Sequence, residues 1–273
     1  MKREYDAAVE DHYRQVALEQ GLSPRSTMLD DVTRETETQA ITAFVASVLS
    51  QTQRPFAVLD AGCGNGYSLS MLAGRFAGPQ FVGVEKSEPL LALARSRFSA
   101  GGPVEVWDGD LRDRDFARGR RFDLVICQRV IINLLNIEDQ RLALDNLLVA
   151  CKDGGALLFI EAFKTPLDTL NRARGEFGLP PIPPAHHNLL LADDFFARAD
   201  LQPFAAPDWT VPANFLSTHY FVTRVFHAAM LGERPLVRNS EFVAFFSRAL
   251  PQSIGDYAPL KLCAFRKRAR PSA

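Results

Sequence analysis

The fold is decided by the stretch Val58-Leu-Asp-Ala-Gly-Cys-Gly-Asn-Gly-Tyr67. Its first residues are typical of a buried strand, Asp60 lies at the carboxyl end of that strand, and the alternating glycines predict a turn where a ligand lies against bare backbone. A second apolar run, Phe81-Val-Gly-Val-Glu85, follows about 20 positions later and also ends in an acid. An acid at that place suits the two hydroxyls of a ribose. The two runs together predict a nucleotide-type site at the ends of two strands.

Three classes of nucleotide site share a glycine-rich turn, and the neighbouring side chains separate them. A phosphate-binding P-loop ends in Lys followed by Ser or Thr, whereas here Gly66 is followed by Tyr67 and Ser68. A dinucleotide site places a pyrophosphate at the helix N-terminus, where the carboxylate of Asp60 would repel it. A ligand with a cationic amino-acid end and an adenosine end fits better, because Asp60 can face its ammonium group. These residues therefore indicate S-adenosylmethionine.

The composition is typical of a globular protein outside the membrane. The chain has 273 residues, of which 47% are hydrophobic and 23% charged, and its formal net charge is −1. That charge does not suit a nucleic-acid-binding protein, and we expect the basic run at residues 266–270 to be a solvated tail. The four cysteines lack zinc-ligand spacing, and no apolar run is long enough for a membrane helix. We expect a cytoplasmic protein with reduced thiols and with neither nucleic-acid nor membrane partners.

The chain divides into three segments by its hydrophobic pattern. Residues 1–54 predict amphipathic helices, and residues 55–163 alternate strands with helices. Such alternation predicts a parallel sheet with right-handed crossovers and a ligand site beyond the carboxyl ends of its strands. The pattern changes in residues 164–273, which contain a proline-rich connector at residues 179–188.

Within the last segment we expect four further elements. They are a short helix over residues 193–200, a strand around Trp209, a helix over residues 221–231 and a final strand over residues 257–265.

Five motifs, in chain order, resemble those of the class I S-adenosylmethionine-dependent methyltransferases. They are Leu59-Asp-Ala-Gly-Cys-Gly-Asn-Gly66, Glu85, Asp108-Gly-Asp-Leu111, Phe122-Asp-Leu-Val-Ile-Cys-Gln-Arg-Val-Ile-Ile-Asn-Leu134 and Cys151-Lys-Asp-Gly-Gly-Ala-Leu-Leu-Phe-Ile-Glu161. The resemblance implies an α/β, Rossmann-like parallel sheet with a terminal antiparallel strand. It also implies a helical lid at residues 1–54, a cofactor-binding core at residues 55–163, and a substrate-pocket insertion with the last strands of the sheet at residues 164–273.

The resemblance also implies which residues hold the cofactor. Glu85 is expected at the ribose, Asp110 at the adenine amino group and Leu111 on the adenine ring. For Arg34 we weigh the methionine carboxylate against plain helix docking. The full expected set is Asp60, Gly62, Gly64, Asn65, Gly66, Glu85, Lys86, Asp110, Leu111, Gln128 and Arg34.

Two residues after the fourth predicted strand are candidates for substrate binding. Arg129 could bind an acidic substrate or pair with a surface acid, and we favour a pocket role for Asn133 over one on the helix surface. The segment lacks the Asn-Pro-Pro-Tyr pattern of methyltransferases that act on nucleobase amino groups, which disfavours a base-flipping enzyme. We therefore expect a small-molecule acceptor, and the chain is compatible with a homodimer.

Methyl transfer from a sulfonium needs alignment and exclusion of water more than a strong base. The residues that could serve as a base are His186, His187, His219 and Tyr220. Solvation of the first pair, and core packing of the second, are the alternatives to catalysis. We assign no role to His12 and His227.

We expect no metal site. Asp193 and Asp194 could be combined with the histidine pair at residues 186 and 187, but helix capping accounts for these acids more simply.

Three functions remain open at this point. The first is methyl transfer to an oxygen or nitrogen of a small molecule in specialised or cell-surface metabolism. The second is cyclisation of S-adenosylmethionine with release of methylthioadenosine. The third is a non-catalytic cofactor-binding subunit.

Overall fold

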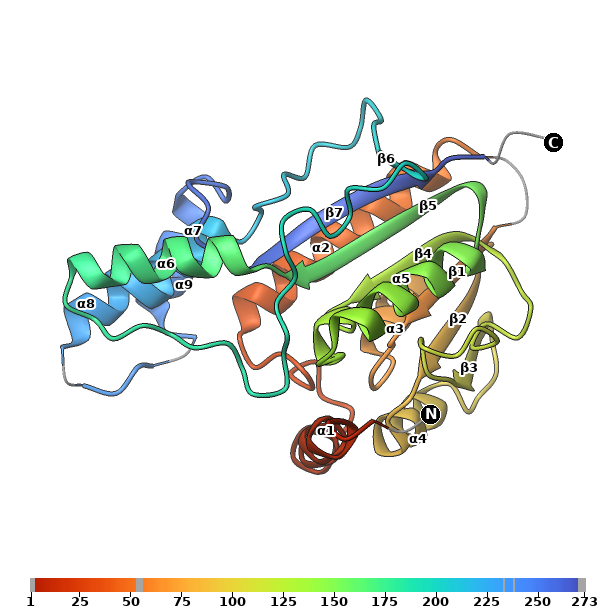
Figure 1. Cartoon of the computed structure of the whole chain (residues 1–273), viewed down its shortest axis with the longest axis horizontal. Helices are drawn as coiled ribbons and strands as arrows, with labels where there is room; N and C mark the ends of the chain where they lie inside the picture. Colours follow the sequence, from red (N-terminus) through yellow and green to blue (C-terminus); the bar gives the residue numbers. More distant parts are fainter. Residues whose placement is uncertain (1–2, 53–55, 233, 238, 270–273) are drawn as a thin grey trace.

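The computed structural model describes residues 3–52, 56–232, 234–237 and 239–269, which form a seven-stranded sheet (Figure 1). Its strand order is β3-β2-β1-β4-β5-β7-β6. The strands are β1 (Ala57–Ala61), β2 (Gln80–Glu85), β3 (Val104–Asp108), β4 (Phe122–Gln128), β5 (Cys151–Ala162), β6 (Leu201–Pro203) and β7 (Leu260–Lys267).

Strands β1 to β5 pair in parallel, whereas β7 runs antiparallel to β5 and β6 antiparallel to β7. This arrangement confirms the expected Rossmann-like sheet with a terminal antiparallel strand. Gly154 and Gly155 lie at an irregularity within β5, because Phe122 pairs with Cys151 whereas Leu124 pairs with Ala156. The strand order reverses at β1, which lies between β2 and β4. In a sheet of this kind, ligands bind outside the carboxyl ends of the strands at that reversal.

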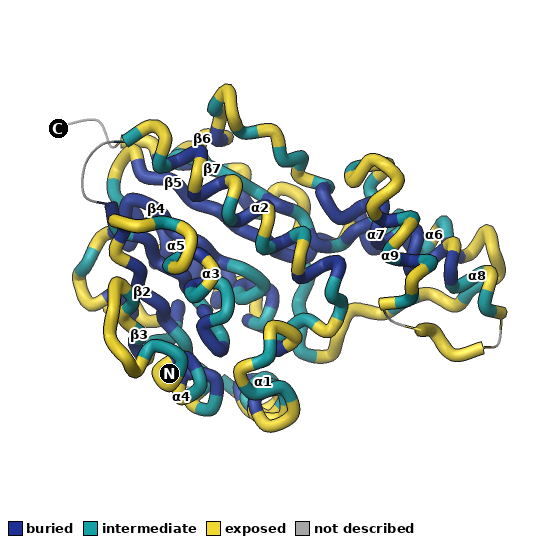
Figure 2. Tube along the Cα trace, turned by 180° about the vertical axis from the view of Figure 1, so that it is seen from behind, coloured by how far each residue is buried: buried dark blue, intermediate teal, exposed yellow. Residues whose placement is uncertain are grey.

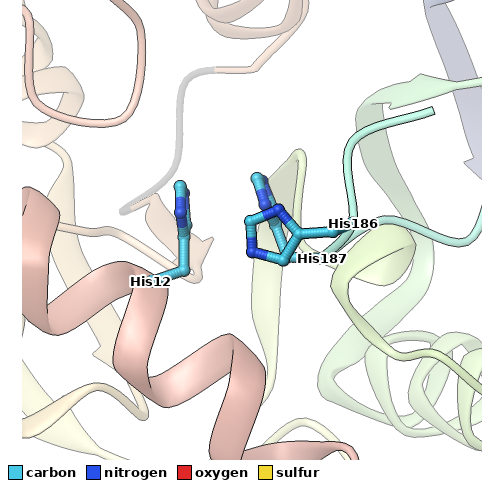
Figure 3. Close-up of side chains that lie close together, drawn as sticks. All are labelled: His12, His186 and His187. Atoms are coloured by element: carbon cyan, nitrogen blue, oxygen red, sulfur yellow. The ribbon is translucent and has the colours of Figure 1, made fainter. Parts of the chain in front are cut away.

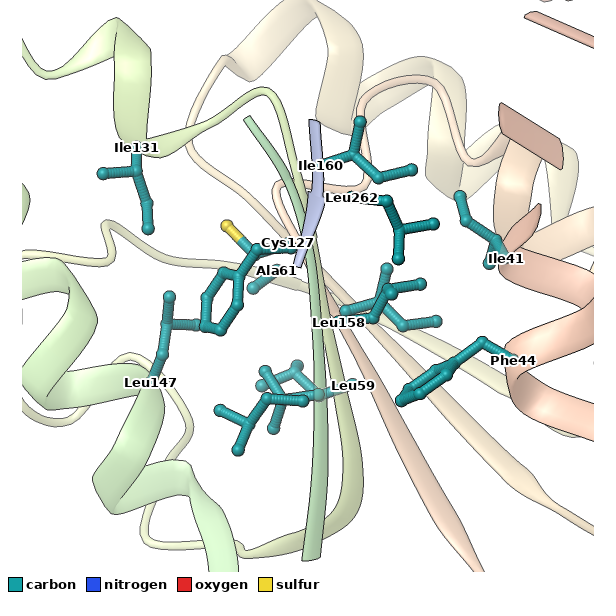
Figure 4. Close-up of a cluster of buried hydrophobic side chains, with 14 of the residues drawn as sticks. Ile41, Phe44, Leu59, Ala61, Cys127, Ile131, Leu147, Leu158, Ile160 and Leu262 are labelled. Atoms are coloured by element: carbon teal, nitrogen blue, oxygen red, sulfur yellow. The ribbon is translucent and has the colours of Figure 1, made fainter. Parts of the chain in front are cut away.

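Helices cover both faces of the sheet. Those in the first two thirds of the chain are α1 (Asp6–Gln20), α2 (Asp31–Leu49), α3 (Tyr67–Arg75), α4 (Glu88–Arg97), the 3₁₀ turn η1 (Ile131–Asn133), α5 (Ile137–Ala150) and α6 (Lys164–Glu176). Figure 4 shows Ile41 and Phe44 of α2 on one side of the sheet and Leu147 of α5 on the other. Helix α2 begins at its capping residue Asp30, whose side chain accepts a hydrogen bond from the backbone N–H of Thr33 (3.0 Å).

The core lies where the central strands meet these helices. Phe44, Phe81, Phe122 and Phe159 have no exposed surface. Figure 2 shows buried residues following the central strands, while α1 is exposed on its outer side. Helix α1 buries only Asp6 and Ala17. It therefore contributes little to the core, in contrast to α2.

The segment between β5 and β7 carries a second group of helices beyond the carboxyl end of β5 (Figure 1). It comprises α6, α7 (Ser217–Phe221), the π-helical turn η2 (Val222–Phe226), α8 (His227–Leu231) and α9 (Glu241–Ala249). The helix expected over residues 221–231 is thus present, but it begins earlier and contains a π-helical turn. No described helix is both long and apolar enough to cross a membrane.

Two expected elements of this segment are wrong. Residues 193–200 form turns rather than a helix, because the ring of Phe196 is held against Phe159 and Phe265 at centroid distances of 4.5 and 5.5 Å. The chain around Trp209 is irregular rather than a strand. The Trp209 ring instead packs edge-on against Phe44, at a centroid distance of 5.0 Å.

The basic run at the end of the chain is only partly a tail. Arg266 and Lys267 are the last residues of β7, and Lys267 is buried with its ammonium group 2.9 Å from the carbonyl of Cys151. Arg270 lies outside the described residues.

We expect Phe44→Ala to lower the free energy of unfolding by about 3–5 kcal/mol, because it leaves a cavity between α2 and the sheet. Leu18→Ala is the matched control, since Leu18 of α1 is 74% exposed and its truncation is expected to change stability by less than about 0.5 kcal/mol. Denaturant unfolding measures both values. Equal losses in the two variants would contradict the assignment of α2, rather than α1, to the core.

Candidate cofactor and substrate site

A cavity opens beyond the carboxyl ends of β1, β2 and β4, at the reversal of strand order. It encloses about 1120 Å³ including its open mouth. The expected residues that line it are Arg34, Asp60, Gly62, Gly64, Asn65, Glu85, Lys86, Asp110, Leu111, Gln128, Arg129 and Asn133. Its other lining residues include Asp6, Val9, Glu10, Tyr13, Ser26, Thr27 and Tyr67.

The glycine turn between β1 and α3 brings the backbone to the cavity wall. Gly62 has a φ of +85°, and a Cβ atom there would lie 2.2 Å from the side chain of Val130. Gly64 has a φ of +57°, which favours glycine even though a Cβ atom there would meet no neighbour closer than 3.9 Å. The backbone N–H of Gly62 donates to the carbonyl of Val84 (2.7 Å) and fixes the turn over the end of β2.

Gly66 differs from the other glycines of the turn because it lies outside the cavity lining. It is the capping residue of α3, with a φ of +76°. A Cβ atom there would lie 2.8 Å from the ring of Phe98 and 3.4 Å from Ala94. The position therefore permits close packing of α3 against α4.

Two carboxylates lie side by side in the cavity wall. Asp60 is 3% exposed, and burial together with the charge of Glu85 raises its pKa to about 7, against the opposing effect of Arg34. Glu85 accepts hydrogen bonds from the backbone N–H groups of Gly64 and Ser87, both at 2.8 Å. Burial raises the pKa of Glu85 as well, although these N–H groups oppose the shift. Such a pair favours a cationic ligand, because a positive charge relieves the repulsion between the acids.

Asp110 follows β3 and belongs to a group of ion pairs. Its carboxylate lies 2.6 Å from the guanidinium of Arg112 and 3.4 Å from the ammonium group of Lys86. Both cations also contact Asp6 of α1, at 3.0 and 3.1 Å. Burial acts to raise the pKa of Asp110, but the hydrogen bonds from Arg112 outweigh it and hold the pKa at about 2. Asp110 is therefore ionised at neutral pH, and charges attach α1 beside the cavity.

Arg129 begins the turn after β4 with a φ of +55°, which is uncommon for a residue with a side chain. Its guanidinium forms an ion pair with Glu37 of α2, whose side chain has no exposed surface. Arg129 therefore has an acid partner within the protein, but that partner is buried and not the surface acid that we weighed against a substrate. Glu37 itself was not among the expected site residues.

The same turn is held by Glu161, a buried residue of β5. Its carboxylate accepts hydrogen bonds from the backbone N–H groups of Val130, Ile131 and Ile132 at 3.0, 3.0 and 3.2 Å. Burial raises the pKa of Glu161 to about 7, against the effect of these N–H groups. The side chain thus fixes the backbone on which Arg129 stands.

Asn133 and Tyr13 join this turn to α1. The side-chain amide of Asn133 donates to the hydroxyl oxygen of Tyr13 (2.7 Å) and to the carbonyl of Arg129 (2.8 Å). Burial raises the pKa of Tyr13 to about 12, so that its hydroxyl keeps its proton at neutral pH.

Several lining residues carry buried polar atoms that have no hydrogen-bond partner among the described residues. They are Ser26 Oγ, Arg34 Nε, Ser87 Oγ, Gln128 Nε2 and Asn133 Oδ1. Each unpartnered atom of this kind costs about 1–3 kcal/mol, so that their concentration around one cavity is typical of a site built for a polar ligand.

Two of the four candidate catalytic residues, His219 and Tyr220, lie on α7 away from the cavity lining. His219 has its Nε2 atom 2.8 Å from the carboxylate of Asp30 and its Nδ1 atom 2.8 Å from Ser247 Oγ. The guanidinium of Arg224 covers the ring of Tyr220 at 3.8 Å. These contacts join α7 to α2 and α9, which is the packing role that we weighed against catalysis.

The other two candidates, His186 and His187, also lie outside the lining and meet His12 of α1 (Figure 3). The rings of His12 and His187 stack at a centroid distance of 3.7 Å, and His186 lies edge-on to both. Burial, with the neighbouring histidines, lowers the pKa of His187 to about 4. The ring of Tyr13, which lines the cavity, lies 6.2 Å from that of His187. His12, to which we assigned no role, therefore belongs to a cluster behind the cavity wall.

Comparisons with known proteins bear on the fold and on the class of domain. Residues 58–155 match the model of a family described as a methyltransferase domain. The N-methyltransferase NodS from Bradyrhizobium japonicum WM9, in complex with S-adenosyl-L-homocysteine, has a TM-score of 0.55 and 17% identity over 94% of this chain and 98% of its own. Magnesium protoporphyrin IX methyltransferase (ChlM) from Synechocystis PCC 6803, with bound S-adenosylhomocysteine, has a TM-score of 0.51. Its identity is 18% over 86% of this chain and 85% of its own. No curated protein matches the chain.

At these identities the two solved structures show a shared fold, and the family model adds the class of domain. Residues 58–155 form a methyltransferase domain, and the sheet has the Rossmann-like fold of the two solved methyltransferases. The chain thus contains a methyltransferase domain, and the cofactor of this family of domains is S-adenosylmethionine.

We expect Asp60→Asn to change stability and cofactor binding in opposite directions. The pKa of Asp60 in the folded protein, about 7, lies above its ordinary value, so the folded protein keeps a proton that the unfolded chain loses. Stability conferred by that proton is complete below about pH 4 and is lost as the pH rises through 7. The variant should therefore exceed the wild type in free energy of unfolding at pH 8, by on the order of 2 kcal/mol, and match it at pH 4.

Denaturant unfolding without cofactor at the two pH values measures this difference, and calorimetry should show S-adenosylmethionine binding at least tenfold more weakly to the variant. If the stability of wild type and variant changed identically with pH, the pKa of Asp60 would not be raised in the folded protein.

Proposed function

We propose that the protein transfers the methyl group of S-adenosylmethionine to an oxygen or nitrogen atom of a small molecule by in-line displacement. One observation carries this proposal: a single cavity joins the acids expected at the cofactor to a second set of polar side chains from α1 and the β4 turn. Its lining includes Glu85 and Asp110 as well as Tyr13, Arg129 and Asn133. Its volume of about 1120 Å³, mouth included, suits a cofactor together with a small acceptor.

We assign the adenosine half of the cofactor to the ends of β2 and β3. Glu85 is proposed to accept hydrogen bonds from the ribose hydroxyls and Asp110 from the adenine amino group. A carboxylate can accept about four hydrogen bonds, so Glu85 retains capacity beside the backbone N–H groups of Gly64 and Ser87. Asp110 already accepts four hydrogen bonds from Arg112, and the adenine amino group would replace one of them. Leu111, which is 5% exposed, is proposed to pack on the adenine ring.

We assign the methionine half to the end of β1 and to α2. Asp60 is proposed to face the ammonium group, and Arg34 the carboxylate. Arg34 donates from Nη2 to the carbonyl of Ser26 (2.7 Å) and to Thr27 Oγ1 (3.0 Å), which leaves its buried Nε atom without a partner. The backbone of Gly62 and Gly64 admits the ligand closely, and Asn65, Lys86 and Gln128 complete the wall.

The acceptor is proposed to lie against Tyr13, Arg129 and Asn133. The structure describes all five histidines of the chain, and none of them lines the cavity. Tyr13 keeps its proton at neutral pH and therefore acts as a hydrogen-bond donor rather than a base. The chain's contribution is then to orient the acceptor and exclude water, which suits a neutral amine or a readily ionised hydroxyl, as found in acceptors of specialised or cell-surface metabolism.

We propose that α1 is the mobile part of the lid. It buries only Asp6 and Ala17, and its attachment near the cavity is polar, through Asp6 and Tyr13. Breaking these polar contacts requires less free energy than removing α2, which carries the core residue Phe44.

We expect Glu85→Ala to weaken binding of S-adenosylmethionine by at least tenfold, because the ribose hydroxyls lose a charged acceptor. Glu88→Ala is the matched control, since Glu88 lies three residues further along the chain and does not line the cavity. Calorimetric titration measures both affinities, and unchanged binding by the Glu85 variant would favour a scaffold role for the domain.

The nucleoside product tests the reaction itself. Chromatography after incubation with small hydroxyl and amine acceptors should show S-adenosylhomocysteine and a methylated acceptor. Methylthioadenosine formed without any acceptor would instead establish intramolecular cyclisation.

A further inference from the structure

Three of the five histidines converge from two segments that are far apart in the sequence. His12 comes from α1, whereas His186 and His187 come from the loop between α6 and β6. Figure 3 shows the three side chains directed toward one another. One ring nitrogen from each residue lies within 4.8 Å of the other two. His186 is exposed, as the alternative of solvation has it, but its ring also lies close to two other imidazoles.

We propose that His12, His186 and His187 bind a divalent transition-metal ion. Imidazole nitrogens suit zinc, copper and nickel, and a set of three histidines is a known way to hold zinc with a water molecule in the fourth position. The acids Asp193 and Asp194, which we considered as ligands from the sequence, are not in the cluster. Three nitrogen ligands therefore favour zinc, copper or nickel over calcium and magnesium, which take oxygen ligands.

The hydrogen bonding of these rings supports the proposal independently. His187 has a buried Nδ1 atom without a hydrogen-bond partner among the described residues. His219, in contrast, has both ring nitrogens engaged, by Ser247 and Asp30. A buried ring nitrogen needs a donor, an acceptor or a metal ion as its partner. Two other imidazoles lie beside His187 and could bind the same ion, which favours a metal ion as the partner.

Metal binding requires a small rearrangement of the rings. The stacked planes of His12 and His187 direct their nitrogens nearly in parallel, since the angle between the planes is 17°. Zinc–nitrogen bonds of about 2.0–2.1 Å bring the ligand nitrogens of a tetrahedral site to about 3.3 Å from one another. The torsion between Cβ and the imidazole ring is broad, so His12, which is half-buried, can turn at low cost.

The cluster lies between α1 and the part of the protein that carries the cofactor site, so an ion bound there would join the two. Residues next to His187 are fixed to the cofactor-binding body, because the backbone N–H of Leu189 donates to the carbonyl of Ile132 (2.7 Å) and Gln140 Nε2 donates to the carbonyl of Leu189 (2.8 Å). His12 stands next to Tyr13, which lines the cavity. An ion held by the cluster would therefore fasten α1 over the cofactor site, whatever the acceptor is.

The test uses the full untagged chain, freed of metal with a chelator and titrated calorimetrically with zinc chloride. We expect one ion per chain with a Kd of about 10 µM or tighter. His12→Phe keeps a ring in the stack but removes a ligand nitrogen, and His186→Gln alters an exposed residue. Each should weaken binding at least tenfold. His227→Gln is the matched control, because His227 stacks on Phe242 outside the cluster and its replacement should leave the affinity unchanged.

Cobalt chloride gives a second readout, since three nitrogen ligands and water should produce the intense visible absorption of a tetrahedral cobalt site in the wild type and in His227→Gln alone. Zinc should also slow hydrogen exchange in α1 of these two proteins. The proposal is overturned if the wild type binds zinc no more tightly than the His12 and His186 variants do. It is also overturned if only His227→Gln loses binding. Neither readout depends on methyl transfer, so failure here is distinct from failure of the proposed function.

Discussion

The contact on which the site depends joins the carboxylate of Glu85, at the end of β2, to the backbone N–H of Gly64 in the turn after β1. It holds the glycine turn in the positive-φ conformation that opens the cavity, and it keeps a second acid, Asp60, beside the first. Burial raises the pKa of both acids, and the charge of Glu85 raises that of Asp60 further. A cationic cofactor supplies the charge that this arrangement lacks. The same constraint thus shapes the backbone and selects the ligand.

Around this pair, ion pairs and hydrogen bonds within the protein hold the side chains that line the cavity. Asp6 of α1 meets the cations that also hold Asp110, while Glu37 of α2 holds Arg129. Glu161 fixes the turn that carries Arg129 by accepting three backbone N–H groups. Charged residues at such positions look like substrate ligands, yet much of their bonding capacity is used within the protein. The groups left for a ligand are fewer, and they lie on α1, α2 and the β4 turn.

The parts of the site that lie next to a strand could be predicted from the sequence, since Asp60, Glu85 and Asp110 each belong to or follow an apolar run whose register fixes their position. Glu37 could have been found as well, because it precedes Ile41 by four residues on the buried face of α2. The meeting of His12 with His186 could not, because it depends on how α1 and a proline-rich loop pack across the molecule. The helix expected at residues 193–200 was wrong for a related reason: the distant aromatic contacts of Phe196 override the local preference.

The central claim is that a strained carboxylate pair receives a cationic cofactor, and proton release on binding tests it most directly. Calorimetric titration of S-adenosylmethionine at pH 6.5, in buffers that differ in ionisation enthalpy, counts the protons exchanged. Because the pKa of Asp60 lies at about 7 without ligand, the bound cation should lower it and release a substantial fraction of a proton per cofactor. The release should disappear at pH 9, where Asp60 is already ionised. Binding at pH 6.5 with no proton exchanged would contradict the account.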